Sequence, residues 1–261
     1  MTLGINPLLN LLNKGRRKKS SSNRFSDQDI LLISYPRSGN TWLRFLIANV
    51  LKSDGDEINF HNLHEYVPEL GRNTEIIDSK NPPRIIKTHA LHKDKFPRVV
   101  YLVRDGRDVY TSYYHYRQKQ LEEGTSFSDF LRKEDHFPCR WGDHVKSWLD
   151  ADKSHQDFLL IRYEDMLQNT EAQLKKILIF IGLDFTDKTI HQAVEDSHFQ
   201  RMRKRDQTEG RKYNLTGTKD FVRKGKSGSW KSEFSREDID FFKESDGDML
   251  IRLGYEKDQS W

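Results

Sequence analysis

Short apolar segments of strand length alternate along this chain with longer amphipathic segments of helix length. The predicted strands are residues 29–35, 84–88, 98–103 and 158–163, and the predicted helices are 41–51, 109–120 and 164–182. Strands that alternate with helices fold as a parallel sheet, because each connecting helix must pack back on a face of the sheet. The pattern therefore predicts an α/β fold with a central parallel sheet flanked by helices.

The length of 261 residues suits one enzyme-sized domain that needs no disulfide or metal for stability. We expect a basic N-terminal arm over residues 1–25, because this stretch has little apolar surface to bury. Residues 26–261 form the predicted domain. Within it, the polar and highly charged stretch 199–224 is predicted to be a lid loop, and the amphipathic stretch 233–261 is predicted to pack as closing helices.

Charge and cysteine content limit the partners and the compartment. Lys plus Arg number 44 and Asp plus Glu 40, so the net charge of +4 is too small to predict nucleic-acid binding. The single cysteine, Cys139, excludes an internal disulfide and favours a reducing compartment. The N-terminus lacks the basic start of a signal peptide, and no run of about 18 apolar residues occurs. We expect a cytoplasmic protein without a membrane span, whose oligomeric state the sequence does not predict.

The segment Tyr-Pro-Arg-Ser-Gly-Asn-Thr-Trp, residues 35–42, joins the first predicted strand to the first predicted helix. Backbone N–H groups and the positive end of the helix dipole converge in such a loop and suit a phosphate. Gly39 permits close approach of the backbone. Side-chain donors are expected from Ser38, Asn40 and Thr41. The spacing of a Walker A loop is absent, and an ordinary capped turn is the alternative interpretation.

This loop resembles the 5′-phosphosulfate loop of sulfotransferases that use 3′-phosphoadenosine 5′-phosphosulfate (PAPS), usually written Tyr-Pro-Lys-Ser-Gly-Thr-Thr-Trp. Residues 104–112, Arg-Asp-Gly-Arg-Asp-Val-Tyr-Thr-Ser, resemble the 3′-phosphate motif of that family. Residues 223–231, Arg-Lys-Gly-Lys-Ser-Gly-Ser-Trp-Lys, resemble its C-terminal closing segment. The likeness runs from about residue 30 to the C-terminus. It implies a P-loop-kinase-like sulfotransferase fold over residues 26–261, and sulfuryl transfer from PAPS that releases adenosine 3′,5′-bisphosphate (PAP).

The resemblance assigns two sets of residues to the donor nucleotide. The set for the 3′-phosphate is Arg104, Ser112, Arg223, Lys224 and Gly225. The set near the adenine base is Trp42, Tyr163, Ser197, Phe199 and Met202. An arginine suits a phosphate because its planar fork donates two parallel hydrogen bonds. From the residues alone, Arg104 could equally pair with Asp105 or Asp108, and Trp42 could belong to the core.

His89 is the predicted general base, because an imidazole at the end of a strand can remove a hydroxyl proton near neutral pH. Lys87 lies two residues earlier and points to the same side of the strand, where it can meet the oxygens of the transferring group. Arg37 replaces the usual loop lysine of the family. It can stabilise the leaving group by its charge but cannot donate a proton. Because cationic side chains can supply the charge, no metal is expected.

Two other functions remain open on the sequence alone. A P-loop-type small-molecule kinase would need a Walker A lysine and a Mg²⁺ carboxylate, and neither is recognisable. A non-catalytic nucleotide or anion binder would leave His89 and Lys87 without a use.

The expected acceptor is a small polar molecule that carries a hydroxyl or, as the second choice, an amine. Glu65 and Glu69 would share a face if residues 59–72 were helical, and this would suit a positive charge. Glutamates that simply face water are the commoner case.

Overall fold

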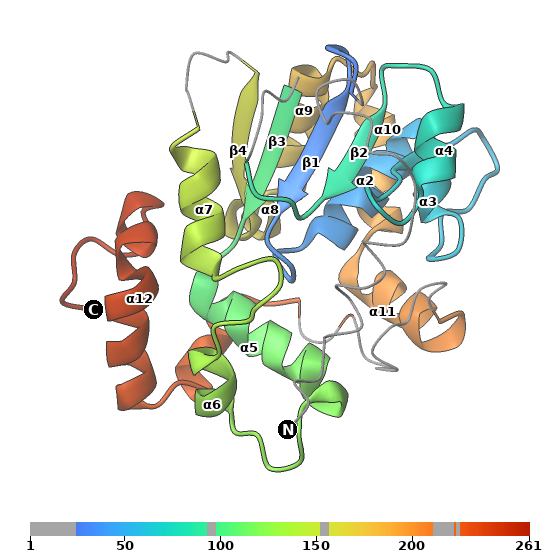
Figure 1. Cartoon of the computed structure of the whole chain (residues 1–261). Helices are drawn as coiled ribbons and strands as arrows, with labels where there is room; N and C mark the ends of the chain where they lie inside the picture. Colours follow the sequence, from blue (N-terminus) through green and yellow to red (C-terminus); the bar gives the residue numbers. More distant parts are fainter. Residues whose placement is uncertain (1–24, 93–97, 152–156, 211–221, 223–224) are drawn as a thin grey trace.

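Four parallel strands form the sheet that the alternation predicts. The computed structural model describes residues 25–92, 98–151, 157–210, 222 and 225–261, so the predicted arm at 1–25 lies outside it except for Phe25. The strands β1 (Ile30–Ser34), β2 (Ile85–Thr88), β3 (Arg98–Val103) and β4 (Phe158–Arg162) pair in the order β2-β1-β3-β4 (Figure 1). All pairings are parallel. The loops after the strands therefore meet at one edge of the sheet, where α/β proteins bind their ligands.

The helices follow the strands in the predicted alternation. Before β3 lie α2 (Asn40–Leu51), α3 (Leu63–Tyr66) and α4 (Thr74–Ser79). Between β3 and β4 lie α5 (Gly106–Arg117), the 3₁₀ turn η2 (Gln118–Gln120), α6 (Phe127–Arg132) and α7 (Trp141–Leu149). After β4 come α8 (Tyr163–Gln168), α9 (Thr170–Ile181), α10 (Asp187–Asp196), α11 (Phe199–Thr208), η3 (Ser229–Ser232) and the closing helix α12 (Arg236–Arg252). In the part of the chain that the structure describes, no helix is both long and apolar enough to cross a membrane.

Each face of the sheet carries its own apolar core, because side chains alternate between the two faces of a strand. Leu31 and Tyr101 pack on one face in a cluster that includes Trp141 of α7. Leu32 lies on the other face, in a cluster that includes Leu178 of α9, and α9 and α10 lie behind the sheet in Figure 1. The two layers of helices confirm the predicted fold class.

Three predicted helical or loop segments differ from the structure. The helix predicted from residue 109 begins at Gly106, because the Asp105 side chain accepts a hydrogen bond from the Arg107 N–H and caps the new first turn. Residues 164–182 form two helices, since Asn169 caps the second one. The stretch 199–224 begins with α11 rather than a loop. Its inner face carries Met202 and Asp206, too few buried positions to produce an apolar period.

Candidate active site

The loop between β1 and α2 turns through two residues with positive φ. Arg37 has a φ of 70° and Gly39 a φ of 95°. A β-carbon at Gly39 would lie 2.5 Å from Cδ2 of Tyr163, so the close packing under this ring requires glycine. The buried hydroxyl of Ser38 has no hydrogen-bond partner among the described residues. Together with the N-terminus of α2, this hydroxyl offers hydrogen bonds that an anionic oxygen can accept.

Asn40 contributes to this loop differently from the prediction. Its side-chain amide donates to Oγ of Ser34 at 3.1 Å and to the carbonyl of Leu32 at 3.4 Å. The amide therefore ties the start of α2 to the end of β1, and the backbone N–H of Asn40 is what the loop can offer to an anion. The sequence could not show whether the Asn40 side chain binds an anion or binds β1, because an asparagine at this position suits both roles. Thr41 follows in the first turn of α2 and is half-buried.

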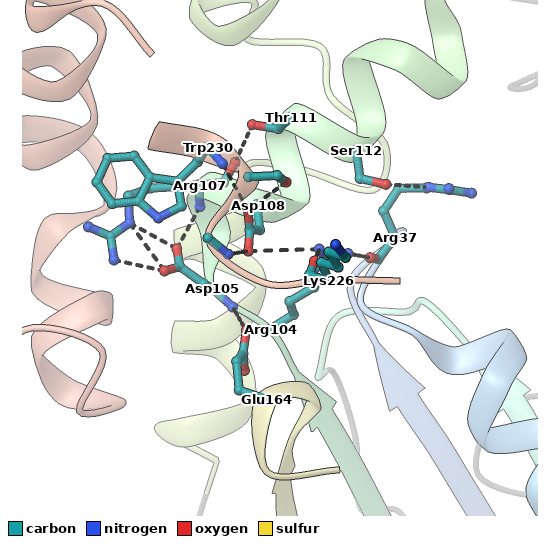
Figure 2. Close-up of polar contacts among 12 residues, drawn as sticks. Arg37, Arg104, Asp105, Arg107, Asp108, Thr111, Ser112, Glu164, Lys226 and Trp230 are labelled. Carbon is teal, nitrogen blue, oxygen red and sulfur yellow. Dashed lines mark hydrogen bonds and ion pairs between the residues drawn. The ribbon is translucent and has the colours of Figure 1, made fainter. Parts of the chain in front are cut away.

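Arg104, the residue after β3, connects three segments that lie far apart in the sequence (Figure 2). Its Nη1 donates to the carbonyl of Arg37 at 3.2 Å, and its Nη2 donates to the carbonyl of Lys226 at 3.0 Å. Its guanidinium carbon lies 4.6 Å from the ring centroid of Tyr163, within reach of a cation–π interaction. Arg104 is only 8% exposed. A buried positive charge thus lies where the predicted phosphate loop meets the predicted closing segment.

Asp108 fixes that closing segment to α5. Its carboxylate accepts hydrogen bonds from the N–H of Gly228 at 2.6 Å, the N–H of Trp230 at 3.0 Å and the hydroxyl of Ser229 at 3.0 Å. It also lies 3.8 Å from Nη2 of Arg104. The alternative partner of Arg104 is therefore present, but the pair is buried and forms part of the same network (Figure 2).

Ser112, one of the predicted 3′-phosphate contacts, reaches the loop after β1. Nε of Arg37 donates to Oγ of Ser112 at 3.1 Å (Figure 2). The guanidinium of Arg37 also lies 4.6 Å from the ring centroid of Tyr116. The resemblance assigned Arg104 and Ser112 to one anion, the 3′-phosphate. In the structure, Arg37 connects them: Arg104 donates to the backbone carbonyl of Arg37, and Ser112 accepts from the guanidinium of Arg37.

The residues predicted near the adenine base gather around α2. The Trp42 and Tyr163 rings meet edge to face at 5.8 Å between centroids, and Trp42 also packs on the buried cluster that contains Met202. Oγ of Ser197 is bound differently, because it accepts a hydrogen bond from the Asn49 side chain at 3.2 Å inside the protein.

Two more residues of the predicted nucleotide site meet at the closing segment. Gly225 has a φ of 59°, and a β-carbon there would collide with the ring of Phe199. The closing segment therefore packs directly on the first turn of α11. Arg223 and Lys224, which were predicted to contact the 3′-phosphate, lie outside the described residues.

His89 follows β2 and lies against the end of β1. Its Nδ1 lies 2.5 Å from the carbonyl oxygen of Ser34. Because a carbonyl only accepts hydrogen bonds, Nδ1 carries the proton and Nε2 has the lone pair. Burial and the neighbouring Lys87 lower the pKa of His89 well below its usual value. The imidazole is therefore neutral at neutral pH and can accept a proton at Nε2, as the predicted base must.

Lys87 forms a buried ion pair with Glu69. Its Nζ lies 2.7 Å from Oε1 of Glu69, and burial lowers its pKa to about 8 against the attraction of that carboxylate. Burial acts to raise the pKa of Glu69, but Lys87 and Arg72 hold it at about 2. The condition under which Glu65 and Glu69 would share a helix face is not met, because α3 ends at Tyr66 and the carboxylate of Glu69 pairs with Lys87.

Sequence reasoning missed the residues that hold this site together. Asp108 was named only as a possible partner of Arg104, and its hold on the closing segment was not foreseen. The carbonyl of Lys226 has no sequence signature. Arg107 was also missed. Its guanidinium pairs with Asp105 at 2.7 Å and lies 4.0 Å from the ring centroid of Trp230. The described residues contain no group of three or more His, Cys, Asp or Glu side chains that could hold a metal ion.

The described structure is an α/β domain with a loop suited to an anion after its first strand and a buried imidazole after the neighbouring strand. A family model described as the sulfotransferase domain matches residues 27–248. The chain therefore belongs to the sulfotransferase family, and it is a sulfuryl-transferring enzyme.

Individual relatives agree with this assignment. The chain is 30% identical to sulfotransferase 1A1 of Canis lupus familiaris over 257 residues, which cover 84% of each chain. It is 29% identical to sulfotransferase 1E1 of Bos taurus over 79% of this chain and 78% of the relative. Among solved structures, it resembles mouse sulfotransferase SULT7A1 complexed with PAP, with a TM-score of 0.68 and 25% identity over 88% of this chain and 90% of that one.

Proposed function

We propose that this enzyme transfers a sulfuryl group from PAPS to a hydroxyl of a small polar acceptor and releases PAP. The observation that carries the proposal is the hydrogen bond between His89 and the carbonyl of Ser34. Because Ser34 is the last residue of β1, this bond sets the base directly beside the loop that can hold the donor. The single cysteine, Cys139, supports a reducing, cytoplasmic location for the reaction.

The two anionic ends of the donor match two features of the site. The 5′-phosphosulfate suits the loop after β1, where Ser38 and the N-terminus of α2 offer hydrogen bonds. The 3′-phosphate suits the region of Arg104 and Ser112, with Gly225 opposite and Arg223 and Lys224 as further proposed contacts. Near the base we propose Trp42, Tyr163, Ser197, Phe199 and Met202.

The acceptor oxygen forms its bond to sulfur while Nε2 of His89 takes the hydroxyl proton. The bond from sulfur to the bridging oxygen breaks in line, and its electron pair stays on the phosphate of PAP. Lys87 and Arg37 stabilise the negative charge on the oxygens around sulfur and on the leaving phosphate. Arg37 acts by charge alone, since a guanidinium does not lose its proton.

A small polar acceptor fits the character of the residues around His89. Lys87 and Glu69 carry charges next to the base, and Arg72 adds another at the surface. Pockets for hydrophobic ligands are mainly apolar and contain few such groups. A neutral hydroxyl compound is the first choice and an amine the second.

The replacement of His89 by asparagine tests the proposed reaction. We expect turnover to fall roughly 10²–10⁴-fold, while PAP binds nearly as in the wild type, because the base acts on the acceptor proton and not on the nucleotide. Labelled sulfate transfer from PAPS to a panel of hydroxyl and amine compounds measures turnover, and calorimetry with PAP measures affinity. The control is His191→Asn, since His191 is exposed on α10 and pairs with Glu171. Near-normal turnover of the His89 variant would exclude His89 as the base.

A further inference from the structure

A buried charged cluster lies next to His89, on the side of the site where we expect the acceptor to bind (the acceptor side). Lys87 of β2 and Arg44 of α2 are 6% and 8% exposed, and Glu69 lies between them in sequence. Nζ of Lys87 is 2.7 Å from Oε1 of Glu69, and Nη1 of Arg72 is 3.4 Å from Oε2 of the same carboxylate. One carboxylate thus serves Lys87 and Arg72, while Arg44 adds a third positive charge nearby.

The backbone holds Glu69 in this position. The N–H of Lys87 donates to the carbonyl of Pro68, and the N–H of Leu70 donates to the carbonyl of Lys87, both at 2.8 Å. Glu69 and Lys87 form a parallel β-bridge, so this short segment extends the sheet beyond β2. Asn73 completes the support by accepting the N–H of Glu69 on its side-chain oxygen at 3.0 Å. The ion pair is therefore built into the fold and does not depend on a loose surface side chain.

The other charges near Lys87 all disfavour its protonated form. Arg44 approaches from α2, with Nε and Nη2 donating to the carbonyl of Val67 at 3.0 and 2.5 Å. Arg72 approaches from the segment after Glu69. Both arginines repel the ammonium, and burial also removes its hydration. Burial, Arg44 and Arg72 oppose the positive charge of Lys87, and Glu69 is the neighbour that stabilises it.

We propose that Glu69 is a positioning residue of the active site, whose carboxylate keeps Lys87 cationic and aimed beside the base His89. The cation is the group that meets the oxygens of the transferring sulfuryl group. This last step rests on the proposed function, whereas the hold of Glu69 on Lys87 does not.

The proposal predicts how the reaction depends on pH. Lys87 must be protonated, so activity falls as pH rises through its pKa of about 8. His89 must be neutral, so activity falls at low pH, as pH drops through a pKa well below 6.5. Without the carboxylate of Glu69, the pKa of Lys87 drops by about one unit or more. The alkaline limit of activity then moves to lower pH, while the acidic limit is not expected to move up with it.

The first experiment follows Lys87 directly and needs no acceptor. NMR of protein with ¹³C-labelled lysine gives the titration of each side chain, and the variant Lys87→Arg identifies the signal of Lys87. In Glu69→Gln we expect the pKa of Lys87 to fall by about one unit or more, and in Glu69→Asp by less, because the shorter carboxylate keeps part of the attraction. Glu69→Asp also preserves a charge partner if the glutamine variant does not fold. An unchanged pKa of Lys87 in the folded variant would overturn the proposal.

The second experiment connects the pair to sulfuryl transfer. The kcat of Glu69→Gln should fall about fivefold or more at pH 8, because a pKa lowered by about one unit leaves roughly a tenth of Lys87 protonated there, and most of this loss should be recovered at pH 6. In the double variant Glu69→Gln/Lys87→Arg the shift of the alkaline limit of activity to lower pH should vanish, since arginine stays protonated. A loss of the same size at every pH would mean that Glu69 acts on structure alone. If wild type transfers no sulfate to any acceptor, the proposed function fails while the NMR result still decides on the pairing.

Discussion

The donor side and the acceptor side of the proposed active site are held by different kinds of contact. On the donor side, Arg104 binds two backbone carbonyls and Asp108 binds two backbone N–H groups. On the acceptor side, the ionisable side chains of Lys87 and Glu69 bind each other. Backbone N–H and carbonyl groups do not titrate at ordinary pH, whereas the ammonium of Lys87, with a pKa of about 8, does.

Nucleotide binding and sulfuryl transfer should therefore depend on pH differently. Hydrogen bonds to backbone groups hold the donor loop and the closing segment. Nucleotide binding should therefore change little over the pH range in which Lys87 titrates. The transfer step should follow the charge of that lysine. Variants on the two sides should therefore differ in kind: those on the donor side change PAP affinity, and those on the acceptor side change the pH profile.

The largest expected effect is the loss of PAP affinity in Arg104→Ala. Removal of one partner of a charge-assisted phosphate contact costs about 1.5–3 kcal/mol, or roughly 10–150-fold in affinity. Calorimetry with PAP measures this change. The control is Arg252→Ala on α12, which removes an exposed arginine that pairs with Asp150 at 2.5 Å. Equal affinities for the Arg104 variant and the wild type would mean that the 3′-phosphate binds elsewhere.

A smaller effect is expected when Asp108 becomes asparagine. An amide oxygen can still accept hydrogen bonds, but it loses the charge that strengthens the bonds from Gly228 and Trp230. We expect hydrogen exchange of those two backbone amides to quicken about fivefold to tenfold, corresponding to about 1–1.4 kcal/mol.

The amide of Leu70, which donates to the carbonyl of Lys87 on the acceptor side, is the internal reference for this experiment. Its exchange should not change. If it quickens together with the amides of Gly228 and Trp230, the substitution has loosened the whole domain, and Asp108 is not a local anchor.

The donor side was the more predictable half from the sequence. Four apolar runs predicted the strands, and the segment 35–42 between a strand and a helix predicted the anion loop. Arg104 and Ser112 were found because their residue types and spacing resemble a known motif. Such signals lie within one stretch of chain, which is why a pattern can carry them. The hydrogen bond from Arg104 to the carbonyl of Lys226 was not predictable, since every residue has a carbonyl.

The acceptor side depends on contacts between segments and was predicted less well. Glu69 and Lys87 are 18 residues apart, and their pairing follows from a β-bridge that no local pattern specifies. The expectation that Glu65 and Glu69 share a face depended on a helix over residues 59–72, but α3 ends at Tyr66. The helix α11 was missed for a related reason: Met202 and Asp206 alone anchor its inner face.

The smallest expected effect is a change in the pKa of Lys87 that is opposite in sign to the change in Glu69→Gln. Arg72 has a side chain that is 40% exposed and lies 3.4 Å from Glu69, so solvent weakens its influence, and its loss should cost at most about 1 kcal/mol. Because Arg72 repels Lys87, Arg72→Gln should raise the pKa of Lys87, by less than about 0.7 unit, where Glu69→Gln lowers it. The same lysine NMR measures both shifts, and PAP affinity should stay unchanged. A fall in the pKa of Lys87 would mean that Arg72 acts chiefly by holding Glu69 in place, so that its repulsion of the lysine is the minor effect.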